Sequence, residues 1–245
     1  MLNVAYDVGF LFCRVIMDKS PIRSILQLFH YVEKAILLDP GYLENHECTG
    51  GKDGYDEFFL NEGFAGAAPL KALEEALANT QNAAGAREMT QCAFKSCWQA
   101  CGVDYFICTH DDEAFIKRVD ELVAGLTTAV SQQGRTVKTH EPRWNTCPVT
   151  GGTIVTVDVR VSGIGPTLSF VQAPHQGGVE QVIEDFDIEV AKVMHNPVTK
   201  SILTCDTVIE SVQSGKSTTM VSPGPRLRWE AHRIRSTLMQ VDKLS

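Results

Sequence analysis

The stretch that decides the fold is CGVDYFICTHDDEAFIKRVDELVAGL, which runs from Cys101 to Leu126. Its first part, Val103 to Cys108, contains the β-branched and aromatic residues that are typical of a strand. Asp111 and Asp112 follow as candidate helix caps, because their side chains can accept hydrogen bonds from free backbone N–H groups. Apolar residues then recur at helical spacing from Phe115 onward. The stretch therefore predicts a strand that leads directly into an amphipathic helix.

The predicted strand contains an acid, Asp104, among apolar neighbours. Burying a carboxylate costs several kcal/mol unless a cation or a hydrogen-bond network meets it. A second acid, Asp187, lies in the strand-like segment EDFDIEVAKV, on the same face as Glu189. We predict that the two strands lie side by side in one sheet. Asp104 and Asp187 could then converge on a magnesium ion, which prefers carboxylate oxygens. The alternative is that both are strand-end acids that face water, and the sequence leaves both interpretations open.

The rest of the chain supplies further helices and strands. A helix is expected from Pro21, capped by Ser20 and ended by the DPG turn. The segments TIVTVDVRVSG and TLSFVQA, joined by IGP, predict a β-hairpin. We therefore predict an α+β fold with a mixed or antiparallel sheet and helices packed on it. We expect a mainly helical N-terminal region over 1–85 and an α+β domain over 86–245.

Charge is distributed unevenly along the 245 residues. Acids outnumber bases 30 to 22, for a net charge of −8, which argues against binding nucleic acid over the whole surface. Bases gather near the C-terminal end, so any polyanion contact should involve Arg226, Arg228, Arg233 and Arg235. The alternative for these arginines is the solvated face of an amphipathic helix.

The apolar segments and the cysteines indicate the cellular location of the protein and the redox state of its thiols. No window has the roughly 18 unbroken apolar residues of a membrane span, and the N-terminal segment lacks the features of a signal peptide. We therefore expect no membrane association and a cytoplasmic location. Four of the eight cysteines cluster without paired C-x-x-C spacing, which favours reduced structural thiols over a zinc site. They are Cys92, Cys97, Cys101 and Cys108.

A resemblance rests on the order of these segments. A helix, GVDYFI, a helix, a hairpin, TLSFVQAPHQGGVEQVIEDFDIEVAKVMHNP and a basic helix follow one another. This order resembles the nucleotidyltransferase-like superfamily related to DNA polymerase beta, in particular its diverged members from large DNA viruses, phages and unicellular eukaryotes. The resemblance covers about 88–238 and implies a nucleotidyltransferase-like core. It also implies that Asp104 and Asp187 are catalytic, and that they bind magnesium together with Glu189.

The sequence departs from this superfamily at two elements. Gly102 stands where the first metal-binding acid is expected, and Thr90 and Gln91 stand where a glycine pair would grip the triphosphate. A glycine-bearing helix start does occur further upstream, at Gly63 and Gly66. Thr90, Gln91 and Gly63 are therefore the candidate nucleotide-binding residues.

Two hypotheses of different class follow. The favoured one is a catalytically weak or silent copy of the fold that acts as an interaction or assembly module, with protein partners or self-assembly, in a viral particle or a larger complex. The alternative is a magnesium-dependent nucleotidyltransferase that moves a nucleotide from a nucleoside triphosphate to an acceptor hydroxyl. It would use Asp104 and Asp187, helped by Asp158 or Glu189.

Overall fold

The computed structural model describes residues 2–4, 21–39, 61–83, 102–146, 152–174, 178–186, 191–197, 200 and 202–214. The helices are α2 (Pro21–Leu37), α4 (Ala67–Ala83), α5 (Asp112–Ser131), α6 (Gly178–Glu184) and α7 (Asp206–Ser214). The strands are β1 (Leu2–Val4), β2 (Glu62–Ala65), β3 (Gly102–Cys108), β4 (Val137–Thr139), β5 (Arg143–Thr146), β6 (Thr153–Val161), β7 (Thr167–Ala173), β8 (Val193–His195) and β9 (Ile202–Thr204).

The stretch around β3 and α5 folds as its sequence predicts. Strand β3 is followed by α5, and the carboxylate of Asp111 caps the helix by accepting hydrogen bonds from the backbone N–H groups of Glu113 and Ala114. Along β3, Val103, Tyr105 and Ile107 are buried, whereas the alternate residues are half-buried. The strand therefore turns its apolar side towards the main core and its Asp104 side away from it.

One nine-stranded sheet organises the described residues. Its order is β1-β9-β8-β2-β3-β7-β6-β4, and β5 also pairs with β6. The β3–β7 pair is parallel, and the other described pairs are antiparallel, so the predicted mixed sheet is confirmed. The predicted hairpin is confirmed as β6 and β7. Strands from both sides of residue 86 enter this sheet, and the boundary at 86 stays a prediction.

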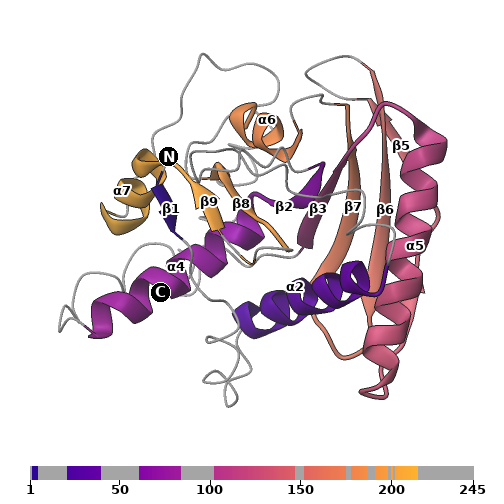
Figure 1. Cartoon of the computed structure of the whole chain (residues 1–245), viewed down its shortest axis with the longest axis horizontal. Coiled ribbons are helices and arrows are strands. Elements are labelled where there is room, and N and C mark those ends of the chain that lie inside the picture. The colour runs from indigo at the N-terminus through magenta and orange to yellow at the C-terminus, as the bar shows by residue number, and fades with distance from the viewer. Residues whose placement is uncertain are drawn as a thin grey trace, which may run out of the picture.

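Helices cover both faces of the sheet (Figure 1). On one face, α2 and α5 pack over the central strands and bury the main core. On the opposite face, α6 covers β2, β3 and β8 through a smaller cluster around Ala65, Val179 and Met194. The sheet ends at β4 and β5 beside α5, and at β1 on the far side (Figure 1).

Helices α2 and α5 approach each other closely at Gly125. A Cβ atom placed there would lie 2.9 Å from the Cα and backbone oxygen of Ala35. Side-chain carbons essentially never come this close to a backbone, so the two helices require a glycine at their crossing. The α2–α5 pair in turn holds α5 in place along the outer part of the sheet.

The later predicted strand differs in extent and neighbours. Its described part is β8, while 187–190 fall outside the residues that the structure describes. Strand β8 shares the sheet with β3, but β2 lies between them. Because Asp187 falls outside the described residues, the expectation that its strand lies beside β3 stays a prediction. No local pattern predicts that β2 lies between β3 and β8, because β2 comes from a short segment far upstream.

Candidate functional site

A row of polar residues crosses three strands on the sheet face opposite α5. Asp104 on β3 is in register with Ser169 on β7, and Ser169 is in register with Asp158 on β6. With neighbouring strands about 4.8 Å apart, the Cα atoms of Asp104 and Asp158 are separated by about 10 Å. The acid that the structure brings into the row of Asp104 is therefore Asp158.

Asp158 is neutralised within this row. The hydroxyl of Ser169 donates to Asp158 Oδ1 at 2.8 Å, and Nη2 of Arg143 donates to Oδ2 at 2.7 Å. Both carboxylate oxygens thus have a donor, and the Arg143 contact ties β5 to the middle of β6. Among the described residues, no group of three or more His, Cys, Asp or Glu side chains could hold a metal ion. The contacts of Asp158 therefore link β5, β6 and β7.

Most of the other predicted site residues lie beyond the described ranges. These are the metal-binding candidates Asp187 and Glu189, the nucleotide-binding candidates Thr90 and Gln91, and the arginines Arg226, Arg228, Arg233 and Arg235. Gly63 is described and lies inside β2, where a Cβ would sit 3.3 Å from the backbone oxygen of His195. The glycine that directly precedes a helix is instead Gly66, with a φ of 86° before α4.

Of the clustered cysteines, Cys108 is the one that the structure describes. It is a free thiol on β3, and it packs against the cluster under α6. Burial, with a further contribution from the negative charge of Glu62, raises the pKa of the Cys108 thiol to about 12. The thiol is therefore protonated and unreactive at neutral pH, as expected of a structural cysteine.

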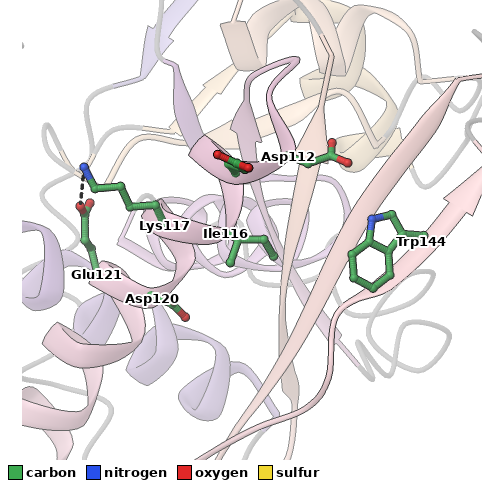
Figure 2. A pocket seen from close by; sticks show the side chains of 7 residues that line it. Asp112, Ile116, Lys117, Asp120, Glu121 and Trp144 are labelled. Atoms are coloured by element: carbon green, nitrogen blue, oxygen red, sulfur yellow. Dashed lines mark ion pairs between the residues drawn. The ribbon is translucent and has the colours of Figure 1, made fainter.

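A hollow of about 610 Å³ opens between the N-terminal half of α5 and strand β5 (Figure 2). We call it the α5–β5 hollow. Trp144 forms one wall, and its side chain is 60% exposed, which is unusual for so large an apolar residue. The hollow is lined by Asp112, Glu113, Ile116, Lys117, Asp120, Glu121 and Trp144.

The α5–β5 hollow is negatively charged. Four of its lining residues are carboxylates and one is a lysine, Lys117, which pairs with Glu121 at 3.9 Å. Glu113 and Asp120 form no ion pair with any other residue that the structure describes. The hollow thus combines an exposed indole, an apolar floor at Ile116 and carboxylates that are available to a ligand.

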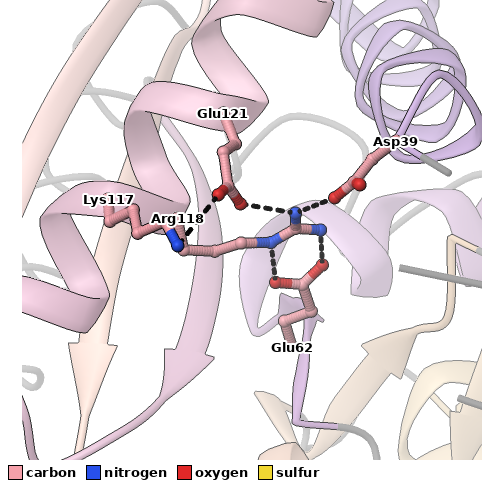
Figure 3. Close-up of polar contacts among 5 residues, drawn as sticks. All are labelled: Asp39, Glu62, Lys117, Arg118 and Glu121. Carbon is pink, nitrogen blue, oxygen red and sulfur yellow. Dashed lines mark hydrogen bonds and ion pairs between the residues drawn. The ribbon is translucent and has the colours of Figure 1, made fainter. Parts of the chain in front are cut away.

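The helix that carries these carboxylates is anchored by Arg118 (Figure 3). Arg118 forms a two-pronged contact with Glu62 on β2, at 2.9 and 2.7 Å, and it also contacts Asp39 at 2.6 Å. Burial acts to lower the pKa of Arg118, but its hydrogen bonds and the charge of Glu62 outweigh burial and raise the pKa above its usual range. The guanidinium is therefore permanently charged, and it fixes α5 against β2 and the end of α2.

Neither Arg118 nor Trp144 is among the site residues predicted from the sequence, although the sequence around each contains a signal. Arg118 lies between Phe115 and Leu122 at helical spacing, on the buried side of α5, where a charge requires partners. Trp144 lies in PRWNTCP, a segment with a proline at each end, as is typical of an edge strand. The partners of these two residues are distant in the sequence: Glu62 for Arg118, and the lining residues of α5 for Trp144.

No model of a protein family matches the chain, and no curated protein matches it. Within the described residues, no helix is both long and apolar enough to cross a membrane.

Proposed function

We propose that the protein is a binding module that docks a cationic segment of a partner protein in the α5–β5 hollow. The observation that supports this is the 60% exposed indole of Trp144 beside four carboxylates. An indole face attracts ammonium and guanidinium groups, and carboxylates form charge-assisted hydrogen bonds with them. An exposed tryptophan is also among the residues that most often dominate binding energy at interfaces.

The proposal agrees with the favoured hypothesis of an interaction or assembly module. A catalytically silent nucleotidyltransferase-like core is one origin for such a module, and it remains part of the proposal together with a viral or multi-subunit setting. The rigid anchoring of α5 through Arg118 supports binding, because a preorganised surface loses little conformational entropy when a partner docks.

Calorimetric titration with a lysine-rich peptide tests this function. We expect binding that weakens as salt is raised, and at least a tenfold loss of affinity for Trp144→Ala and for Asp120→Lys. Glu210→Lys is the matched control, because it reverses another exposed carboxylate, on α7. A glutamate-rich peptide of the same length should not bind. If both hollow variants bind the lysine-rich peptide as tightly as the wild type, the proposal is wrong.

A second candidate function is magnesium-dependent transfer of a nucleotide from a nucleoside triphosphate to an acceptor hydroxyl. It is favoured by the common face of Asp104 and Asp158, two strands apart. Gly102, where the resemblance expects the first acid, lies on this same face by strand alternation. A Cβ there would lie 3.7 Å from the backbone oxygen of Thr167, which is an ordinary van der Waals contact.

Turnover and metal binding test this second function. If it holds, Asp104→Asn and Asp158→Asn should each abolish magnesium-dependent turnover of a nucleoside triphosphate, since an amide supplies no charge to the metal. Gly102→Asp should raise magnesium affinity, because it adds a carboxylate to the row. An unmodified protein that shows neither turnover nor binding of magnesium with triphosphate would exclude this function.

A further inference from the structure

Strand β5 lies at an edge of the sheet that the described strands form. It pairs with β6 through Arg143 to Thr146, and no other described strand lies on its second side. All four of its side chains are exposed. An edge strand offers unpaired N–H and C=O groups to any chain that can add a further strand.

The direction of these backbone groups follows from two hydrogen bonds of β6. The N–H of Val155 donates to the side chain of Gln172 on β7, and the C=O of Asp158 accepts from the N–H of His140, which leads into β5. Odd-numbered residues of β6 therefore turn their backbone groups towards β7, and even-numbered ones towards β4 and β5. Trp144 is in register with Val155, so this pair exchanges no backbone hydrogen bond. The N–H and C=O of Trp144 consequently point away from β6, to the side of β5 where no described strand lies.

The side chain of Trp144 lies on the face that α5 covers. Its register partner Val155 is fully buried in the main core, and Trp144 lines the hollow together with residues of α5. A strand added beside β5 would place every second side chain on this same face. Cβ atoms of directly opposed residues lie about 4.5–5.5 Å apart, so a lysine or arginine opposite Trp144 is within cation–π range of the indole.

Charge decides which chain would occupy this edge. A second copy pairing through β5 would bring the carboxylates of one α5–β5 hollow next to those of the other, and like charges in contact oppose association. An extended segment with basic residues on alternate positions instead matches both the outward backbone groups of Trp144 and the carboxylates of α5.

We infer that the partner binds as an added β-strand along β5, with lysine or arginine at every second position facing α5. This inference rests on the proposed function, because it specifies the conformation of the cationic segment that the α5–β5 hollow receives. Main-chain hydrogen bonds would set the register of that segment, and the basic side chains would supply selectivity.

Backbone N-methylation separates strand addition from charge attraction alone. Two peptides of alternating lysine and threonine would carry the same number of N-methyl groups, one set on the lysine amides and the other on the threonine amides. In an added strand, one set of amides faces β5 and the other faces solvent. We expect the two peptides to differ at least tenfold in affinity, with the weaker one methylated on the amides that pair with β5.

Amide hydrogen exchange provides a second measurement on the protein itself. In the free protein, we expect the Trp144 amide to exchange quickly and the Asn145 amide, which faces β6, to exchange slowly. Binding of the unmethylated peptide should slow exchange at Trp144 at least tenfold and leave Asn145 unchanged.

The outcomes distinguish this inference from the proposed function. If both methylated peptides bind as tightly as the unmethylated one, and Trp144→Ala still weakens them all, strand addition is wrong and cationic docking stands. If no lysine-containing peptide binds, both fail. A free protein that sediments as a dimer, and that peptide converts to a monomer, would overturn the choice of a different chain as the occupant.

Discussion

Gln172, buried in β7, donates a hydrogen bond of 2.9 Å from its side-chain amide to the carboxylate of Asp112 at the start of α5. Its side-chain oxygen also accepts the N–H of Val155, at the point where β6 parts from β7 to pair with β5. One amide thus joins the helix and the strand that form the two sides of the α5–β5 hollow.

Replacing Gln172 by methionine should therefore cost stability and binding together. The change leaves the buried N–H of Val155 without an acceptor, which typically costs about 1–3 kcal/mol. Urea denaturation should report this loss, and peptide affinity should fall as well. Gln172→Glu retains an acceptor for Val155 but brings a second carboxylate towards Asp112. If Gln172→Met unfolds at the same urea concentration as the wild type, the amide is not a structural link.

Gly125→Ala should destabilise the protein, although alanine is the better helix former. The gain in helix propensity is up to about 1 kcal/mol. The new Cβ, however, would meet the backbone of Ala35 at 2.9 Å, and the helices would have to move apart. Overpacking of this kind costs about 1–3 kcal/mol, so the clash should outweigh the propensity.

An exposed position on the same helix provides the control for Gly125. Ala124→Gly changes propensity in the opposite direction without any clash, and it should lower the free energy of unfolding by up to about 1 kcal/mol. A Gly125→Ala variant that is more stable than the wild type in urea would show that α2 and α5 are free to separate.

Arg118→Leu should be the most destabilising of these changes. It leaves Glu62, which is 5% exposed, as a buried carboxylate without its cation, and breaking such a pair costs about 3–5 kcal/mol. Arg118→Lys should recover only part of this loss, because an ammonium cannot form the two-pronged contact with a carboxylate.

A double variant tests whether the loss comes from the isolated charge. Arg118→Leu combined with Glu62→Leu should be markedly more stable than Arg118→Leu alone, as measured by urea denaturation. Additive losses would contradict this explanation and would indicate that Arg118 and Glu62 stabilise the protein independently.

The pairing of Arg118 with Glu62 illustrates how much of this fold the sequence can predict. Local patterns are sufficient for β3, α5 and the β6–β7 hairpin, because alternation, helical spacing and the Asp111 cap are all encoded within neighbouring residues. Local patterns do not predict which distant segment forms a strand between two others. Thus β2 lies between β3 and β8, and its Glu62 becomes the partner of Arg118, 56 residues away.

The candidate site was only partly predictable for the same reason. The sequence identifies Asp104 as a carboxylate in an apolar strand, and it does lie on the less buried face of β3. Its row partner Asp158 depends on β7 pairing in parallel with β3, which requires the crossover through α5 and the hairpin. The α5–β5 hollow likewise depends on where an edge strand meets a helix, and no spacing rule specifies that meeting.

His195 provides the last prediction, because its side chain is buried and has no hydrogen-bond partner in the described part of the chain. The side chain is 2% exposed and stacks on Phe29 with ring centroids 4.6 Å apart. Neither ring nitrogen has a hydrogen-bond partner among the described residues. Burial lowers the pKa of His195 to about 4, and the nearby carboxylate of Glu33 opposes this only in part. Glu33 itself is held by Lys200 at 2.7 Å and by His30 at 3.7 Å.

Stability should therefore fall as the pH is lowered through the range from about 6.5 to about 4. In this range the unfolded chain binds a proton at His195 and the folded protein does not, so acid favours unfolding. The loss from this group should reach on the order of 3 kcal/mol below pH 4 and be absent above pH 7. His195→Phe keeps an aromatic ring against Phe29 and removes the titration. Urea denaturation of both proteins from pH 7.5 to pH 4 should show the variant gaining on the wild type by about this amount. Other groups titrate equally in both proteins, so they do not affect this difference. If the free energies of unfolding of the two proteins change in parallel with pH, His195 binds its proton in the folded state as readily as in the unfolded chain, and the prediction is wrong.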